Sequence, residues 1–395
     1  MMTADTDLFG LFTSPAVRPD PYPEYARLLA TQPVADAGFD LRFVFGYEDC
    51  LTLLRERRVS VDERRSTMGG AAGNQLPTLI HLDPPDHTRL RRLVSTAFTP
   101  RRVEALRARA AALVDATLDR LVTGDEVDLI AELAYPVPLT IICDLLGIPV
   151  DDRAAVREWS TWLALSIDPG VLRSPELNAS IDVAEQAFTA YVRDLVAARR
   201  VSPGDDLLSE LVAAEMDGDR LSEDELLGLA VLLLVAGHET TVSLIGNGVL
   251  ALLRHPDQLQ AVRTDVGGER RAVDELLRYD PPVQMTTRVA LADIELPTAT
   301  IPQGSIAVLM LGSANRDPAV FADPHRLDVR VDRSASHLAL GFGIHHCLGA
   351  ALARAEAEVA IPALVRRFPR LQLAAEPELR PTFVLRGRTD LRVRL

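Results

Sequence analysis

The stretch Leu340-Gly341-Phe342-Gly343-Ile344-His345-His346-Cys347-Leu348-Gly349 places one cysteine between a glycine-rich turn and a helix. Residues 350–359, which follow, are rich in alanine and consist almost entirely of good helix formers. Cys347 therefore precedes a helix N-terminus, where free N–H groups and the helix dipole favour the thiolate over the thiol. The glycines leave the backbone free to adopt unusual angles and let a large group approach it.

A thiolate presented on such a loop to a flat, bulky partner is what axial ligation of haem iron requires. Two alternatives compete with this interpretation. A free cysteine is more often a buried, inert residue. A His-His-Cys metal site is the other alternative, although three adjacent residues cannot easily converge on one small ion. The rest of the chain has to distinguish among the three.

The stretch resembles the haem-binding loop of the cytochrome P450 enzymes, whose pattern is Phe-x-x-Gly-x-His/Arg-x-Cys-x-Gly. Gly343, His345, Cys347 and Gly349 match that pattern, whereas Leu340 stands where the family has phenylalanine. The resemblance implies that Cys347 binds the iron of heme b. The loop residues that it implies as cofactor-binding are Gly341, Phe342, His345, Cys347 and Gly349.

The composition is that of a globular protein with a large core, since 48% of the 395 residues are hydrophobic and 25% are charged. The formal net charge of −14 argues against nucleic acid as a partner. Cys50, Cys143 and Cys347 lie far apart, which argues against a disulfide framework and fits a reducing cytoplasm. Residues 1–7 contain neither a basic region nor a long apolar run, so we expect no secretion signal and no membrane anchor.

A long helix is predicted to begin at Ser222 and to end before Pro256. Ser222 and Glu225 have the spacing of a capping box, and apolar residues surround the helix toward both ends. Such a helix is either a membrane span or the axis of a large core. Its polar middle, residues 237–241, interrupts the apolar run and favours a core helix.

The segment Ala236-Gly237-His238-Glu239-Thr240-Thr241 in this polar middle resembles the oxygen-activation motif of the P450 family. Small residues at Ala236 and Gly237 let a planar cofactor approach the helix. By resemblance, Glu239 and Thr240 form a catalytic acid–alcohol pair, and the Thr240 hydroxyl can bond a main-chain carbonyl one turn back. The alternative is a capped or kinked core helix.

His87 and Arg91 are spaced i, i+4 and share one face of a predicted helix. An imidazole and a guanidinium on one face can clamp a carboxylate, and the alternative is a solvated charged face. The resemblance implies that these two residues hold the haem propionates together with Arg288 and His345. The same region of this acidic chain is locally basic and is expected to attract a ferredoxin through Arg89, Arg92, Arg101 and Arg102.

Glu275 and Arg278 lie on one helix face, which alone indicates only an ordinary surface pair. The resemblance implies a buried structural network in which a second arginine joins them. Arg326 matches that second arginine, with Arg330 and Arg333 as less favoured substitutes.

The fold expected is mainly α with a small β module, namely the cytochrome P450 fold with its long central helix across the haem. We expect one domain over residues 1–395, with about the first 15 residues loosely ordered. Segments 66–77 and 166–175 are predicted loops, and the resemblance implies that the second loop and its helices cover the substrate. Short strands are predicted at 282–290, 294–296, 305–311 and 383–385.

The resemblance implies a monooxygenase that uses O2 to hydroxylate or epoxidise a bulky lipophilic small molecule, such as a macrolide, another polyketide or a terpenoid. Electrons are expected from NAD(P)H through ferredoxin reductase and ferredoxin, and the protein is expected to be a cytoplasmic monomer. One rival is a haem-thiolate peroxygenase or isomerase, and another is a non-enzymatic haem sensor. The residues expected to line a mostly apolar substrate pocket are Leu233, Ala236, Val283, Met285, Thr286 and Phe383.

Overall fold

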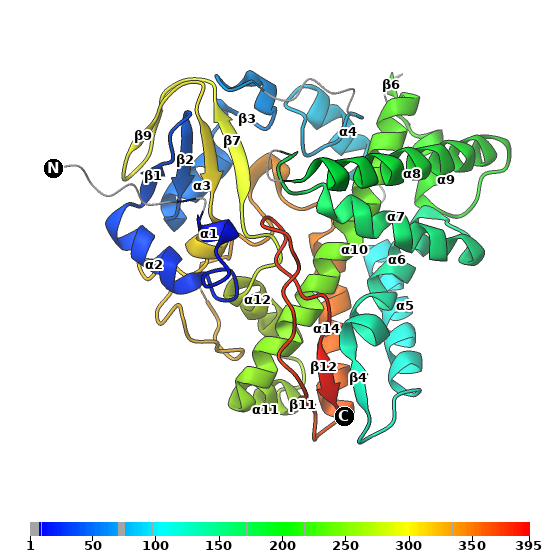
Figure 1. Ribbon diagram of the computed structural model, residues 1–395. Helices are drawn as coiled ribbons and strands as arrows, with labels where there is room; N and C mark the ends of the chain where they lie inside the picture. Colours follow the sequence, from blue (N-terminus) through cyan, green and yellow to red (C-terminus); the bar gives the residue numbers. More distant parts are fainter. Residues whose placement is uncertain are drawn as a thin grey trace.

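The computed structural model describes residues 8, 10–69, 76–95, 98–170, 173–216, 219–333 and 335–395 (Figure 1). Helices make up most of the fold, and a smaller region of β-sheet lies to one side of them, near the N-terminus. The expected class, mainly α with a small β module, is confirmed.

The α-helices are α1 (Gly10–Thr13), α2 (Tyr22–Thr31), α3 (Tyr47–Arg55), α4 (Asp86–Ser95), α5 (Pro100–Leu118), α6 (Pro136–Leu146), α7 (Arg153–Leu165), α8 (Pro175–Val201), α9 (Leu207–Ala213), α10 (Glu223–Arg254), α11 (Pro256–Thr264), α12 (Glu269–Tyr279), α13 (Leu311–Ala314) and α14 (Ala350–Arg367). A π-helical turn, Ile130–Ala134, leads into α6. α8 begins at Pro175, at the end of the predicted loop 166–175, because Ser174 caps it and Pro175 occupies its first turn.

The largest sheet has the strand order β1-β2-β10-β7-β3, in which β2 and β10 run parallel and the other neighbours run antiparallel. A three-stranded sheet has the order β11-β12-β4, and β5-β6 and β8-β9 form separate pairs. The strands are β1 (Val34–Asp36), β2 (Leu41–Val44), β3 (Val59–Ser60), β4 (Glu126–Asp128), β5 (Glu215–Met216), β6 (Asp219–Arg220), β7 (Thr286–Ala290), β8 (Ile294–Glu295), β9 (Thr300–Ile301), β10 (Ile306–Leu309), β11 (Gln372–Leu373) and β12 (Arg392–Arg394).

Three of the predicted strands are shorter than expected, and the fourth is absent. β8 ends at Glu295, one residue early, and β10 covers only residues 306–309 of the predicted 305–311. The strand predicted at 282–290 is reduced to β7, preceded by a single bridge between Val283 and Leu385. The segment 383–385 is a turn and not a strand. The N–H groups of Phe383 and Val384 donate to a side chain, Asp168, and are therefore not used in a ladder.

The long predicted helix is present as α10, which begins one residue after the predicted start. Ser222 caps it, and Glu225 completes the capping box in both directions. By length and composition α10 is apolar enough to cross a membrane, but most of its apolar stretch is buried inside the fold. It packs against α6, α8, α12 and α14 (Figure 1), as expected for the axis of a large core.

Three apolar clusters fill the interior. The helical cluster surrounds α10, and the sheet-side cluster packs α3 against the strands. The N-terminal cluster contains Leu8, Leu11, Tyr25 and Phe45. The expectation that the first residues are loosely ordered is therefore wrong for Leu8 and Leu11, which are buried because this cluster holds them. Residues 1–7 and 9, and residues 70–75 of the predicted loop 66–77, lie outside the described residues.

Candidate functional site

The cysteine loop, residues 340–349, joins the sheet region to α14. Gly341 and Gly343 both have left-handed φ angles, +67° and +69°, which favour glycine. A Cβ atom at Gly343 would also lie 2.5 Å from the Leu54 carbonyl oxygen, so this position has no room for a side chain. The N–H of Cys347 donates to the Leu340 carbonyl at 2.9 Å and closes the loop immediately before α14 begins.

The electrostatic setting of Cys347 differs in part from the sequence-based expectation. Burial raises the pKa of its thiol, whereas the backbone N–H of Gly349 and the charges of Arg91 and Arg354 lower it, and the net direction is upward. The loop and the helix N-terminus alone therefore do not outweigh burial. A metal cation bound at the sulfur removes the proton outright, so the setting suits a metal ligand better than a free thiolate.

Beside this loop, the ring of His87 is buried with 2% exposure, and neither ring nitrogen has a hydrogen-bond partner. Its centroid lies 4.2 Å from that of His345. Arg91, one turn later on α4, donates from Nη2 to the His346 carbonyl at 2.6 Å and so ties α4 to the loop. Buried polar groups are nearly always satisfied, so the unpaired imidazole of His87 indicates a missing ligand.

Arg288 on β7 completes this cluster. It is buried, and burial lowers the pKa of its guanidinium to about 10. Its Nη1 donates to the Thr287 carbonyl at 2.7 Å and to Thr286 Oγ1 at 3.3 Å, and among the described residues it forms no ion pair. Burial, together with the charges of Arg288, His87 and Arg91, lowers the pKa of His345 to about 3. The four predicted propionate ligands therefore do lie together.

We refer to His87, Arg91, Arg288 and His345 as the cation cluster. A buried cationic group costs free energy unless an anion or hydrogen-bond acceptor compensates it. The donor set matches a ligand that carries carboxylates, because arginine and histidine bind such groups through charge-assisted hydrogen bonds. The cation cluster borders the cysteine loop, so one flat molecule that carries carboxylates can contact both the cation cluster and the sulfur of Cys347.

The middle of α10 has one accessible face. Ala236 is exposed and Thr240, one turn later, is partly exposed, although most other residues of this helix are buried. The Thr240 hydroxyl donates to the Ala236 carbonyl at 2.8 Å, which is the predicted bond to the preceding turn. A Cβ atom at Gly237 would lie 3.0 Å from Ile142, so this glycine allows close packing with α6.

Glu239 lies on the buried side of α10, with 1% exposure. It forms an ion pair with Arg380, and its Oε1 lies 3.2 Å from His238 Nε2. Burial raises the pKa of Glu239, but the contact with His238 and the charge and hydrogen bond of Arg380 outweigh burial, and the net pKa is lowered. Glu239 is therefore held ionised.

Three comparisons with known proteins bear on this site. The family model for cytochrome P450 matches residues 43–385. This chain belongs to the cytochrome P450 family. It is 43% identical to the cytochrome P450 monooxygenase PikC of Streptomyces venezuelae over 390 residues, which cover 95% of this chain and 91% of PikC. It is 40% identical to the 6-deoxyerythronolide B hydroxylase of Saccharopolyspora erythraea over 398 residues, which cover 95% and 96% of the two chains.

The fold of this chain also matches that of a solved cytochrome P450 structure. The ligand-free crystal structure of CYP164A2 from Mycobacterium smegmatis superimposes with a TM-score of 0.92 at 42% identity, covering 99% of this chain and all of that one. This P450 is therefore a haem-thiolate monooxygenase with the P450 fold, and its cofactor is haem bound through a cysteine. The unpaired imidazole of His87 and the buried guanidinium of Arg288 fit a group that carries propionates.

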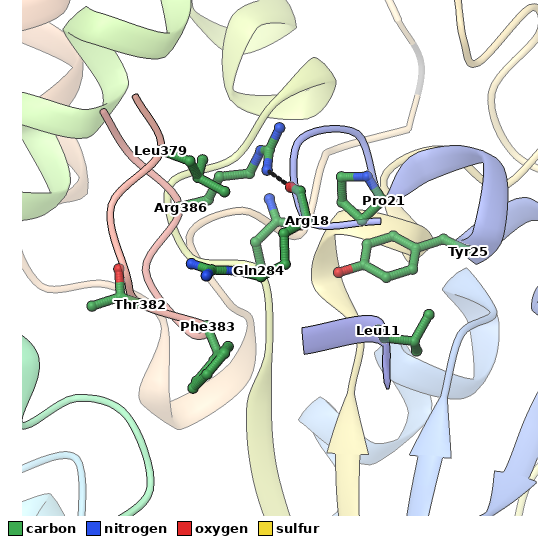
Figure 2. Close-up of a pocket in the computed structure, with 9 residues that line it drawn as sticks. All are labelled: Leu11, Arg18, Pro21, Tyr25, Gln284, Leu379, Thr382, Phe383 and Arg386. Carbon is green, nitrogen blue, oxygen red and sulfur yellow. Dashed lines mark hydrogen bonds between the residues drawn. The ribbon is translucent and has the colours of Figure 1, made fainter. Parts of the chain in front are cut away.

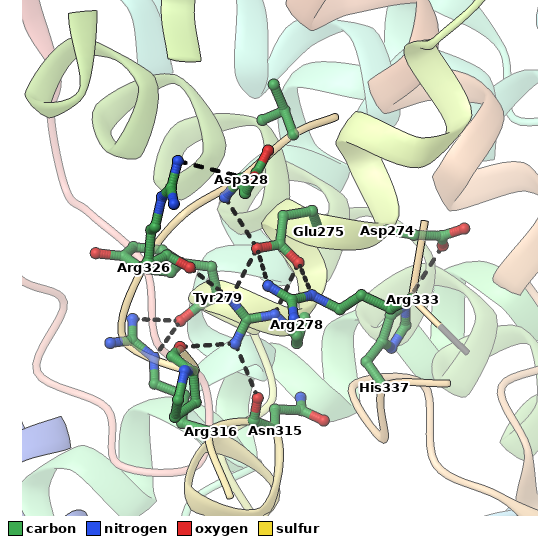
Figure 3. Close-up of polar contacts among 12 residues, drawn as sticks. Asp274, Glu275, Arg278, Tyr279, Asn315, Arg316, Arg326, Asp328, Arg333 and His337 are labelled. Atoms are coloured by element: carbon green, nitrogen blue, oxygen red, sulfur yellow. Dashed lines mark hydrogen bonds and ion pairs between the residues drawn. The ribbon is translucent and has the colours of Figure 1, made fainter. Parts of the chain in front are cut away.

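A buried charge network holds the chain that leads to the cysteine loop (Figure 3). Glu275 on α12 is 3% exposed and accepts from Arg278 Nε and Nη2, both at 2.8 Å. Arg333 Nε and Nη2 reach the same carboxylate at 2.8 and 3.0 Å. Burial raises the pKa of Glu275, but the two arginines outweigh burial and the net pKa is lowered.

The prediction that Arg326 supplies the second guanidinium of this network is wrong. The Arg326 side chain is 66% exposed and approaches only Asp328, at 3.9 Å. Its backbone carbonyl accepts from Arg278 Nη2 at 3.0 Å, so the residue contributes main chain and not charge. The chain already contacts this network through the carbonyls of Pro324 and Arg326 and the N–H of Asp328, and Arg333 is the residue whose guanidinium then reaches the carboxylate. All 42 basic residues of the sequence are arginines.

The residues expected to line the substrate pocket are divided among the three clusters. Leu233 belongs to the helical cluster, and Val283 packs against the sheet-side cluster. Met285 and Phe383 pack with the N-terminal cluster. Thr286 accepts from Arg288 and so lies beside the cation cluster. Of the six residues expected in the pocket, only Leu233 and Ala236 lie on α10, and only Thr286 lies beside the cation cluster.

Phe383 also borders a small cavity of about 30 Å³ on the N-terminal side of its turn (Figure 2). This cavity holds no more than a water molecule, and Tyr25, Gln284 and Arg386 are among its other walls. The Arg18 guanidinium lies 5.4 Å from the centroid of the Phe383 ring. The cavity is therefore too small for a substrate.

The network predicts unequal effects for two arginine substitutions. Arg333→Ala removes one of two cations from a buried carboxylate and should lower the free energy of unfolding by about 2–3 kcal/mol, less than complete loss of a buried pair. Arg326→Ala, the matched control, should change it by no more than about 0.5 kcal/mol. Urea denaturation followed by circular dichroism measures both. Equal losses would contradict the assignment of Arg333.

Proposed function

We propose that Cys347 ligates haem iron and that this P450 hydroxylates or epoxidises a bulky lipophilic small molecule of the macrolide, polyketide or terpenoid type. The observation that carries the proposal is the cation cluster beside the cysteine loop, in which the buried His87 ring has no hydrogen-bond partner and the buried Arg288 forms no ion pair among the described residues. We also propose that the protein acts as a monomer in the cytoplasm and that residues 1–395 form one domain.

Cys347 is favoured over the other cysteines by its surroundings. Cys50 and Cys143 are fully buried in apolar clusters, where burial raises the pKa of each thiol, that of Cys143 to about 12. Cys347 alone lies on a glycine-rich loop beside Arg91 and Arg354, whose charges favour a thiolate.

Leu340 packs with the helical cluster, whereas Phe342 packs with the sheet-side cluster under Arg55, so the two residues flank the loop on different sides.

The protein positions the reactants, and the cofactor supplies the activation of O2 for oxygen insertion. The propionates would be held by His87, Arg91, Arg288 and His345. The small side chain of Ala236 leaves room on the accessible face of α10, and the Thr240 hydroxyl on the same face can exchange its bond to the Ala236 carbonyl for one to a water or to the reacting oxygen. Thr240 is thus placed to hold a proton at the reaction site.

Glu239 is placed to move protons toward Thr240 from the solvent side. Its carboxylate is buried and ionised, and its partner Arg380 has a side chain that is 16% exposed. Release of Glu239 from Arg380 would free the carboxylate to accept a proton and to pass it inward as a general acid. The ion pair therefore acts as a gate on proton entry in this proposal.

The substrate class rests on the relatives and on the apolar surroundings. One relative is named for the hydroxylation of 6-deoxyerythronolide B, and others carry names in polyketide or biotin biosynthesis. Leu233 and Ala236 present a small, apolar surface from α10, as expected for a large lipophilic ligand. The presence of Glu239 and Thr240 favours an O2-dependent monooxygenase over a peroxygenase, an isomerase or a haem sensor.

Electrons are proposed to come from NAD(P)H through ferredoxin reductase and a ferredoxin that docks beside the cysteine loop. Arg92 follows Arg91, which is bonded to His346 of the loop, and Arg92 is exposed there. The exposed Ile344 lies on the same loop. Arg89 and Arg102 are less suited than expected, because Glu225 and Glu210 of this chain already pair with them.

Replacement of the proposed iron ligand gives the first test. Cys347→Ser should abolish the red-shifted CO band of the reduced protein, because that band requires a thiolate ligand. Cys143→Ser is the control and should retain the band. A Cys347→Ser protein that keeps the band would show that another cysteine binds the iron.

The acid–alcohol pair predicts two different defects. Thr240→Ala should bind haem and substrate but yield roughly tenfold less product per NAD(P)H, with H2O2 released instead, because the proton donor at the reaction site is lost. Glu239→Gln should slow the whole cycle roughly a hundredfold. Thr241→Ala is the matched control, since its hydroxyl bonds the Gly237 carbonyl on the buried side. Fully coupled turnover in Thr240→Ala would refute the role of Thr240.

The docking proposal predicts a salt-sensitive defect. Arg92→Glu should slow the first electron transfer from an acidic ferredoxin roughly tenfold at low ionic strength, and much less at high salt, without altering substrate binding. Arg370→Glu is the control, because Arg370 lies in the connection between α14 and β11. The label of β11 stands at the end of the molecule opposite that of α4 (Figure 1). Stopped-flow reduction measures both rates. Equal rates for Arg92→Glu and wild type would show that the ferredoxin docks on another surface.

A further inference from the structure

Asp168, in the connection between α7 and α8, is buried with 5% exposure although its neighbours Pro169 and Gly170 are exposed. Its Oδ1 accepts from the backbone N–H of Phe383 at 2.9 Å and from that of Val384 at 2.8 Å, and its Oδ2 accepts from Phe383 at 2.9 Å. A single carboxylate therefore satisfies two adjacent main-chain donors that lie about 215 positions away in sequence.

The turn that Asp168 holds, residues 382–385, is fixed on its other side by the strand segment before β7. The N–H of Gln284 donates to the Val384 carbonyl at 2.9 Å, and Val283 forms a bridge with Leu385. Figure 2 shows Phe383 at the tip of this turn, close to Gln284. The turn thus lies between a rigid strand on one side and the α7–α8 connection on the other.

Two opposing effects act on the pKa of Asp168 in this contact. Burial raises the pKa of Asp168, whereas the N–H groups of Val384 and Phe383 and the charges of Arg173 and Arg18 lower it. The carboxylate is stable in this position only while both donors are in place, because a buried charge without partners is costly. Separation of the two segments would hydrate the carboxylate and both N–H groups together. The contact is therefore either fully made or fully broken.

We infer that Asp168 is a positioning residue that fastens the α7–α8 connection to the C-terminal turn and thereby slows the release of bulky ligands from the haem pocket. The inference rests on the proposed function, because it requires that the substrate binds beside α10 and is covered by α7 and α8. α7 and α8 both pack on α10, so a connection fastened at residue 168 restrains both helices against α10. Phe383 is then held by the same contact.

A purely stabilising role for Asp168 is the alternative, and amide exchange distinguishes the two. In the holoenzyme without ligand, Asp168→Asn and Asp168→Ala should make the amides of Phe383 and Val384 exchange at least about tenfold faster. The temperature of unfolding should fall by no more than about 4 °C, and the CO spectrum should be unchanged. Asp182→Asn, an exposed carboxylate on α8, is the matched control and should leave these amides as they are in wild type.

Ligand release provides the second measurement. Clotrimazole, a bulky imidazole that binds haem iron, should dissociate at least about tenfold faster from both Asp168 variants, whereas imidazole itself should dissociate at the wild-type rate because it needs no opening of the pocket. Asp168→Glu, which keeps the charge but displaces it, should give the same direction of change if the Ala variant fails to incorporate haem.

The outcomes separate this inference from the proposed function. Unchanged exchange at residues 383 and 384, or equal acceleration of exchange throughout the molecule, would overturn the role of Asp168 while the thiolate CO band remained. Unchanged clotrimazole release with faster local exchange would overturn its effect on the pocket. Loss of the CO band from the wild-type protein would instead refute the assignment of Cys347.

Discussion

The carboxylate of Glu275 is the constraint on which the haem side of this P450 depends. It is almost fully buried, and two guanidiniums from different parts of the chain compensate it. Arg278 belongs to the same helix, but Arg333 comes from the irregular segment that leads to the cysteine loop. The ion pair with Arg333 therefore joins α12 to that segment. The side chain of Asn315 fixes the same segment nearer the cysteine loop, because its Oδ1 accepts from the Leu338 N–H at 2.6 Å.

Two buried charged sites of this protein are compensated in opposite ways. On the buried side of α10, Glu239 forms an ion pair with Arg380 and its Oε1 lies 3.2 Å from His238, so the protein itself supplies a cation for this charge. Beside the cysteine loop, by contrast, His87 and Arg288 form no ion pair among the described residues, although the charge of Asp83 acts on both. A folded chain tolerates such a deficit only where a ligand supplies the missing groups. The stability of the folded protein is therefore coupled to the cofactor, because binding to the native state alone adds to stability.

Local patterns in the sequence predicted the parts of the site that lie within one helix or one loop. The capping box located the start of α10, the i, i+4 spacing paired His87 with Arg91, and the glycines marked the cysteine loop. The partners that come from distant, irregular segments were missed or misassigned. Arg333, Arg380 and Asp168 reach their partners from segments without periodicity, so no spacing in the sequence indicates what they contact. Arg326 was favoured over Arg333 by a motif, but the path of the backbone decides which guanidinium arrives.

The exclusive use of arginine as the basic residue gives these networks planar, multidentate donors that stay charged at any ordinary pH. It also leaves residues 1–395 without a single side-chain amine. A carbodiimide can therefore join this P450 to an electron-transfer protein only through its own carboxylates and the lysines of the partner. Covalent trapping of this kind will report acidic surfaces of the P450 and will not capture a complex formed on its guanidinium-rich face. Arginine-directed dicarbonyl reagents are the chemistry suited to mapping that face.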